Sequence, residues 1–119
     1  MKKYLFIGYP GCSTCRVARK GLEEHQIEFE ERHIAEQKPT EEELLTWLSN
    51  SGLAVEKFFN TGGWVYKSLQ LKNKLPEMNE REKIHLLATD GMLIKRPLLV
   101  GKDRVWVGFK PENWSQEVL

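Results

Sequence analysis

Two cysteines stand three positions apart near the start of the chain, and they are its only cysteines. They enclose Ser13 and Thr14, which gives the segment Cys12-Ser13-Thr14-Cys15. Thiols at this spacing can form a disulfide with each other or supply two ligands to a metal ion. In a reducing compartment such a pair is rarely a structural crosslink and is more often catalytic, redox-sensing or metal-binding. The pair therefore indicates redox chemistry, with metal binding and simple packing as alternatives.

Zinc is the weaker of these alternatives, because a tetrahedral site needs four ligands and the cysteine pair supplies two. The three histidines are scattered, at His25, His33 and His85, and no two of them have the spacing of a ligand pair. We therefore predict no metal site and no bound cofactor.

The elements on either side of the pair decide how reactive it is. Lys3–Tyr9 has the pattern of a buried strand, Pro10 and Gly11 break it, and Arg16–Gln26 has the pattern of a helix. The start of a helix carries a partial positive charge and free N–H groups, which lower the pKa of a thiol placed there. We therefore expect Cys12 to be the nucleophile and the more shielded Cys15 to be the resolving thiol.

Two kinds of side chain on this predicted helix have expected roles. Arg16 and Arg19 are expected to add positive charge to its first turns. An apolar face is expected to cover the core, formed by Val17, Ala18, Gly21 and Leu22.

The remaining patterns predict one α/β domain over residues 1–119. A second strand is expected at Ile27–Ile34, and capping boxes at Thr40/Glu43 and Asn79/Glu82 predict two helices. Further expected elements are a short helical region with Val55, Phe58 and Phe59, a hairpin of Leu98–Val100 with Val105, Val107 and Phe109, and a final helix from Pro111. This βαβ…ββα order is the thioredoxin plan, with a helical insertion between the halves. The four tryptophans are expected in core or half-buried positions.

Arg96-Pro97 precedes the predicted hairpin. An X–Pro bond before an apolar strand is a candidate cis peptide, and proline is also tolerated where a strand simply begins. Arg96 is accordingly either an anion clamp beside the thiols or a solvated arginine.

The composition limits the classes of partner that this chain is expected to bind. The formal net charge is +1, so no charged field favours nucleic acid, and no apolar run is long enough to span a membrane. We expect a monomer in the cytoplasm, without direct nucleic-acid or membrane binding.

Four segments together are similar to one family. They are Tyr9–Arg16, Phe58–Thr61, Lys95–Val100 and Val107–Lys110, and in this order and spacing the chain resembles the ArsC/Spx family. The resemblance implies a thioredoxin-like fold, a reactive Cys12, and an Arg96 that precedes a cis-proline, Pro97, and points at that cysteine.

The resemblance leaves three functions open. One is a thiol–disulfide redox protein that forms a Cys12–Cys15 disulfide, with a protein disulfide partner or with glutathione or a thioredoxin/glutaredoxin-type reductant. Another is an Spx-type redox regulator that binds the C-terminal domain of the RNA polymerase α subunit. The third is a glutathione- or glutaredoxin-coupled arsenate reductase, which Gly62 and Lys110 disfavour because those enzymes carry arginines at the two matching positions.

Overall fold

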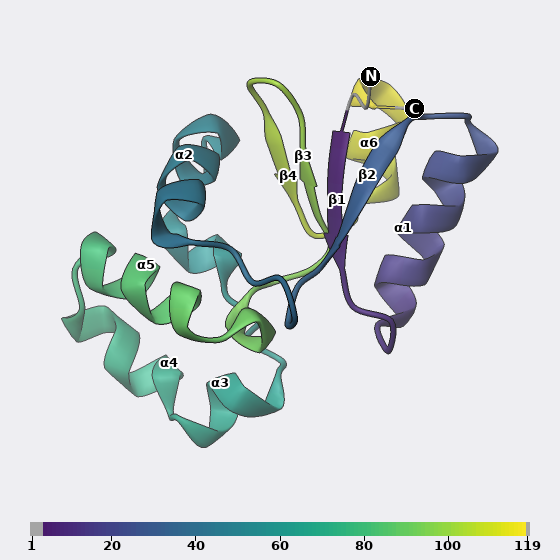
Figure 1. The fold of residues 1–119 in the computed structure, drawn as a ribbon. Helices are drawn as coiled ribbons and strands as arrows, with labels where there is room; N and C mark the ends of the chain where they lie inside the picture. Colours follow the sequence, from purple (N-terminus) through teal and green to yellow (C-terminus); the bar gives the residue numbers. More distant parts are fainter. Residues whose placement is uncertain (1–3, 119) are drawn as a thin grey trace.

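A computed structural model describes residues 4–118 of the chain. Its centre is a four-stranded sheet in the order β2-β1-β3-β4, in which β1 and β2 are parallel and the other neighbours are antiparallel. The strands are β1 (Tyr4–Gly8), β2 (Phe29–His33), β3 (Leu98–Val100) and β4 (Val105–Val107). Figure 1 shows α1 (Ser13–Glu24) and α6 (Pro111–Glu117) on one side of the sheet and the inserted helices on the other. The predicted thioredoxin-like α/β fold with a helical insertion is confirmed.

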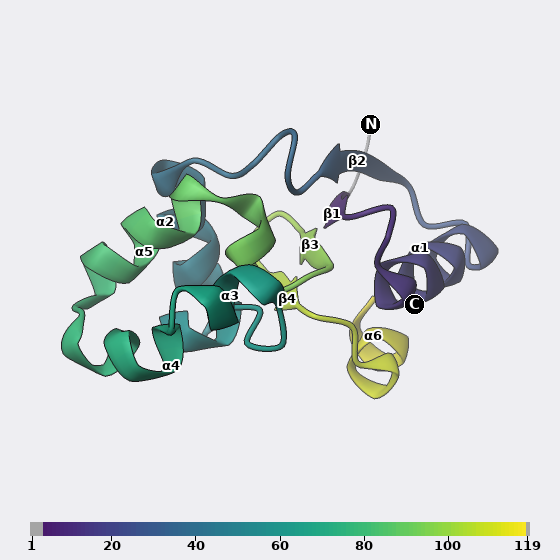
Figure 2. The ribbon, with the colours of Figure 1, turned by 90° about the horizontal axis from the view of Figure 1, so that it is seen from below.

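The alternation of side chains along β1 builds the two layers. Phe6 packs with α1 and α6 in a cluster that also contains Leu22 and Trp114, whereas Ile7 faces the cluster under the inserted helices. Successive residues of a strand point to opposite faces, so one short strand supplies both cores. Seen from below in Figure 2, the sheet runs between the two helical layers.

Helix α1 begins earlier than its sequence pattern predicts. It starts at Ser13 and ends at Glu24, because Cys12 itself takes the N-cap position. The preceding strand is observed as Tyr4–Gly8, and Lys3 lies outside the described residues.

The expected core face of α1 is wrong at one residue. Cys15, Ala18 and Leu22 face the core, at the i, i+3 and i+7 spacing of one helical stripe. Val17 falls outside that stripe and is 59% exposed.

The insertion consists of α2 (Glu41–Ser51), α3 (Trp64–Ser68), α4 (Leu71–Lys74) and α5 (Glu80–Thr89), with 3₁₀ turns at Val55–Phe58, Leu75–Glu77 and Gly91–Leu93. Both predicted capping boxes are present, since Thr40 and Asn79 each exchange hydrogen bonds with the glutamate three residues on. Gly52 ends α2 in the left-handed conformation that favours glycine.

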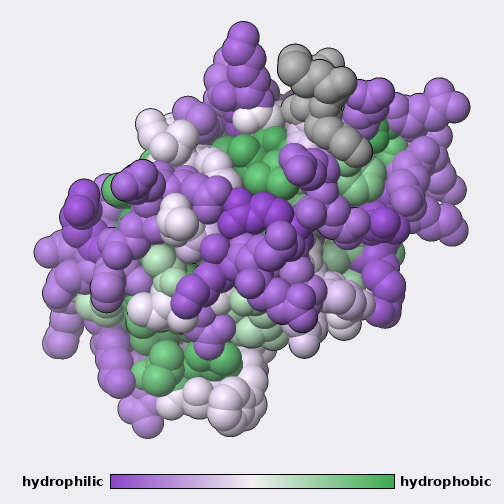
Figure 3. Space-filling view, viewed as in Figure 1, coloured by the Kyte–Doolittle hydropathy of each residue, from purple (hydrophilic) through white to green (hydrophobic). Residues whose placement is uncertain are grey.

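Two other expectations about the surface and strands are wrong. Trp64 is 80% exposed at the start of α3, in a region where Figure 3 shows hydrophobic residues gathered on the surface around α3 and α4. Strand β4 ends at Val107 and does not reach Phe109, because Gly108 turns the chain with a φ of 76°.

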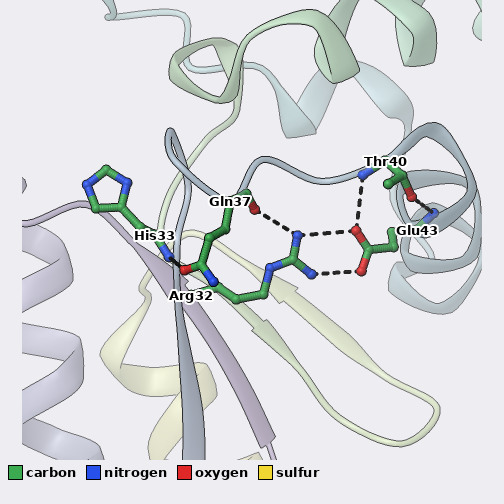
Figure 4. Close-up of polar contacts among 5 residues, drawn as sticks. All are labelled: Arg32, His33, Gln37, Thr40 and Glu43. Atoms are coloured by element: carbon green, nitrogen blue, oxygen red, sulfur yellow. Dashed lines mark hydrogen bonds and ion pairs between the residues drawn. The ribbon is translucent and has the colours of Figure 1, made fainter.

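An ion pair ties the edge of the sheet to the insertion. Arg32 of β2 donates to both carboxylate oxygens of Glu43 in α2, at 2.7 and 3.2 Å, and to the carbonyl of Gln37 (Figure 4). The same glutamate accepts the backbone N–H of Thr40, so the ion pair and the helix cap share one carboxylate. Within residues 4–118, no helix is both long and apolar enough to cross a membrane.

Candidate redox site

The loop between β1 and α1 lies at the lower end of the sheet in Figure 1, and Cys12 is the residue of this loop that caps α1. Its backbone N–H donates to the carbonyl of Tyr9 at 3.0 Å, which closes the turn through Pro10 and Gly11. Its sulfur accepts the backbone N–H of Cys15 at 3.3 Å and thereby caps the helix. The half-buried thiol is thus held at the positive end of α1.

This environment favours the thiolate of Cys12. Burial alone would raise the pKa of Cys12, but hydrogen bonds from the Cys15 thiol and backbone and the nearby charge of Arg96 outweigh it, with a smaller contribution from the Thr14 backbone. The pKa of Cys12 therefore lies below the ordinary value of a thiol.

Cys15 has the opposite character. It is 3% exposed, and burial, followed by its hydrogen bond to Cys12, raises its pKa to about 12. Both cysteines are free thiols in this structure. The two sulfurs therefore differ in exposure and in acidity, as a nucleophile and a resolving thiol do.

Arg96 reaches the pair from the other half of the fold. A short antiparallel contact between Phe59 and Ile94, flanked by backbone hydrogen bonds, holds the segment that precedes Arg96. The Arg96–Pro97 peptide bond is cis. The buried Nε and Nη1 atoms of Arg96 find no acceptor among residues 4–118. The guanidinium carbon lies 5.3 Å from the ring centre of Tyr9.

The two arginines in the first turns of α1 have partners of their own. Arg16 donates to the carbonyl of Pro10 at 2.9 Å, and Arg19 pairs with Glu31 and Glu23. The cation that acts on both cysteines is Arg96. Arg16 and Arg19 add positive charge to the first turns of α1 as expected, but their side chains bond to acceptors other than the thiols.

Ser13 and Thr14 form the exposed first turn of α1. Gly62 is exposed, and a Cβ built there would meet no atom within 4 Å. Lys110 is exposed at the start of α6. Of Gly62, Arg96 and Lys110, only Arg96 carries a charge that acts on the two thiols.

A cavity of about 510 Å³ is lined by residues of β1, the first turns of α1 and β2. It is lined by Gly8, Cys15, Arg16, Arg19 and His33 among others. A Cβ on Gly8 would lie 3.1 Å from the Phe6 ring and 3.4 Å from the Cys15 sulfur, so the glycine keeps the strand close to this thiol. In the part of the chain that the structure describes, no group of three His, Cys, Asp or Glu side chains is arranged to hold a metal ion.

Two contacts at the site have no signal in the sequence. They are the ring contact between Tyr9 and Arg96 and the edge contact between Tyr9 and His33, whose ring centres lie 5.4 Å apart. Each joins residues that are far apart in the chain, so spacing could not reveal them.

Comparison with known proteins places this geometry in one family. The sequence model of the ArsC family matches residues 7–116. The uncharacterized protein YusI of Bacillus subtilis is 54% identical over 114 residues, which cover 92% of this chain and 97% of YusI. The regulatory protein MgsR of the same organism is 36% identical, over 89% of this chain and 82% of MgsR.

Two further matches extend the comparison. The global transcriptional regulator Spx of Streptococcus agalactiae is 30% identical, over 87% of this chain and 74% of Spx. A crystal structure of an ArsC family related protein from Bacteroides fragilis is 56% identical and superimposes with a TM-score of 0.94, over 98% of this chain and 97% of that one.

Proposed function

The chain belongs to the ArsC family, and from that premise we propose that it is a thiol–disulfide redox protein in which Cys12 is the nucleophile and Cys15 the resolving thiol. One observation carries the proposal. The acidic, half-buried Cys12 and the buried Cys15, whose pKa is about 12, are joined by a hydrogen bond at the start of one helix.

The proposed reaction has two exchanges. The Cys12 thiolate attacks one sulfur of a substrate disulfide, forms a mixed disulfide and releases the other substrate sulfur as a thiolate. Cys15 then loses its proton and attacks the Cys12 sulfur, which releases the second substrate thiolate and leaves a Cys12–Cys15 disulfide. Two electrons pass from the pair to the substrate, and two equivalents of glutathione or one dithiol protein would return them.

The first exchange also prepares the second. Both a hydrogen bond to Cys12 and the charge of its thiolate contribute to the raised pKa of Cys15. A mixed disulfide removes the negative charge from Cys12 and with it that part of the increase, so Cys15 loses its proton more readily when it is needed as a nucleophile. Burial, the largest cause, still raises the pKa of Cys15.

A redox titration in glutathione buffers of defined potential tests this proposal, with the oxidised pair detected by intact mass. We expect a reversible intramolecular disulfide with a midpoint between about −270 and −180 mV, the range spanned by thioredoxin, the glutaredoxins and protein disulfide isomerase. Cys15→Ser should accumulate a Cys12–glutathione adduct, and Cys12→Ser should form neither product. A pair that forms no reversible disulfide over this range refutes the proposal.

A second candidate is redox regulation through binding, favoured by the regulatory names of the MgsR and Spx relatives. In this alternative, oxidation of the pair alters a surface that contacts the C-terminal domain of the RNA polymerase α subunit. Calorimetric titration of that domain with the reduced and the oxidised protein distinguishes the candidates. A regulator binds in one redox state only, whereas an oxidoreductase turns over with a thiol reductant and needs no such binding.

A further inference from the structure

The position of Arg96 is not explained by hydrogen bonds. Two of its guanidinium nitrogens are buried without an acceptor among residues 4–118. Fixing a long side chain costs conformational entropy, and no hydrogen bond offsets this cost for Arg96. Another contact must therefore hold its guanidinium where the charge acts on Cys12. The contact that the structure provides is with the ring of Tyr9, 5.3 Å from the guanidinium carbon.

We propose that Tyr9 is a positioning residue whose ring holds the guanidinium of Arg96 beside the sulfur of Cys12. The inference rests on the proposed function, since it concerns the same thiol. The side chain of Tyr9 acts through Arg96, and its contribution is to fix a cation.

An aromatic ring suits this task better than an acidic side chain. The face of the ring attracts a cation through its quadrupole and carries no net charge, and the attraction is strongest where the cation has lost water. A carboxylate in the same place would also fix Arg96, but its negative charge would offset the guanidinium and raise the pKa of Cys12. With Tyr9 as the partner, the positive charge of Arg96 remains available to the thiolate.

Tyr9 is itself held from a second side. Its ring forms a T-shaped contact with His33 at the end of β2, with ring centres 5.4 Å apart and an angle of 74° between the planes. The backbone carbonyl of Tyr9 also accepts the N–H of Cys12. Both the ring and the backbone of Tyr9 are therefore fixed in the turn between β1 and α1.

His33 is in turn held by the turn that follows β2. Its Nδ1 accepts the backbone N–H groups of Ala35 and Glu36 at 3.2 and 3.1 Å, which sets the ring orientation. Its own backbone N–H donates to the Gln37 side chain at 3.0 Å, a bond drawn in Figure 4. A series of contacts thus runs from the edge of the sheet through His33 and Tyr9 to Arg96.

The test measures the reactivity of Cys12 with iodoacetamide as a function of pH, using intact mass and peptide mapping. Cys15 is buried with a pKa of about 12, so alkylation below pH 9 reports on Cys12. Tyr9→Phe keeps the ring and is the matched control, whereas Tyr9→Leu removes it. We expect Tyr9→Phe to match the wild type and Tyr9→Leu to slow alkylation at pH 7 by roughly three- to tenfold.

A double variant separates positioning from packing. If Tyr9 acts through Arg96, Tyr9→Leu changes nothing further in an Arg96→Ala background. If Tyr9 only fills space, Tyr9→Leu slows alkylation equally in both backgrounds, and the proposal is overturned. Wild-type reactivity of the single Tyr9→Leu variant overturns it as well.

If Tyr9→Leu does not fold, a substitution that keeps the shape of the ring can test the same proposal. Incorporation of 3,4,5-trifluorophenylalanine at position 9 keeps the packing but weakens the negative face of the ring. We expect slower alkylation than with phenylalanine at this position, and equal rates would refute the role of Tyr9. None of these rates requires a disulfide, so loss of the Tyr9 effect and failure of the redox titration are separate results.

Discussion

The sulfur of Cys12 caps the helix that contains Cys15, by accepting the Cys15 backbone N–H at 3.3 Å. One atom therefore has a structural and a chemical role. As an acceptor it satisfies a free N–H group at the start of α1, and as a thiolate it gains stability from the same bond. The link explains how a reactive group can sit in a rigid turn without an additional capping residue.

The two roles of Cys12 are separable by substitution. Cys12→Ser keeps an acceptor at the N-cap position, whereas Cys12→Ala removes it. We expect the alanine variant to be less stable than the serine variant by about 1 kcal/mol, the usual value of an N-cap side chain. Urea unfolding followed by tryptophan fluorescence under reducing conditions measures the difference. Equal stability of the two variants would show that the sulfur does not cap the helix.

Gly91 opens the turn Gly91–Leu93 that precedes Arg96, and it lies against the backbone of the chain that follows β2. A Cβ on Gly91 would collide with the backbone carbonyl of Ile34, and backbone cannot move aside as a flexible side chain can. We expect Gly91→Ala to cost roughly 3 kcal/mol or more, or to prevent folding. Soluble yield and urea unfolding measure this.

Gly62 is the matched control for Gly91. A Cβ there meets nothing within 4 Å, so Gly62→Ala should change stability by less than about 0.5 kcal/mol. If the two alanine variants were equally stable, the close approach of Gly91 to the chain after β2 would be incorrect.

Local rules predicted much of the fold. The capping boxes at Thr40 and Asn79 need only a side chain and a glutamate three residues away, and both form as predicted. The apolar run that predicts β1 and the break at Pro10 are local in the same sense. These signals are sufficient because each is satisfied within one turn of the chain.

The features that could not be predicted from the sequence depend on contacts between distant parts of the chain. Val17 is apolar and is expected in the core from the sequence, but the face of α1 that packs in the core is the stripe of Cys15, Ala18 and Leu22, which leaves Val17 exposed. The charge of Arg16 and Arg19 lies near the pair in sequence, yet the charge that acts on Cys12 comes from Arg96, in the other half of the fold. Such partners are set by tertiary packing, which spacing along the chain does not encode.

The ion pair between Arg32 and Glu43 should make stability depend on pH. The Arg32 hydrogen bond, supported by Thr40, lowers the pKa of Glu43 below its ordinary value of 4.5 despite partial burial. In the unfolded chain the carboxyl returns to that ordinary value, so the folded protein binds its proton less tightly. The stabilisation is therefore complete above pH 4.5 and is lost as the pH falls through the lower, folded value.

Glu43→Gln tests this dependence, since glutamine keeps the shape and removes the charge. We expect a loss of about 1 kcal/mol at pH 7, held to that size by the partial exposure of both side chains. The difference from the wild type should shrink as the pH is lowered below 4.5, in urea unfolding at a series of pH values. Glu42→Gln is the matched control, because Glu42 is exposed in the same helical turn. A pH-independent loss in Glu43→Gln would mean that the cap at Thr40, and not the charge on Arg32, accounts for the contribution of Glu43.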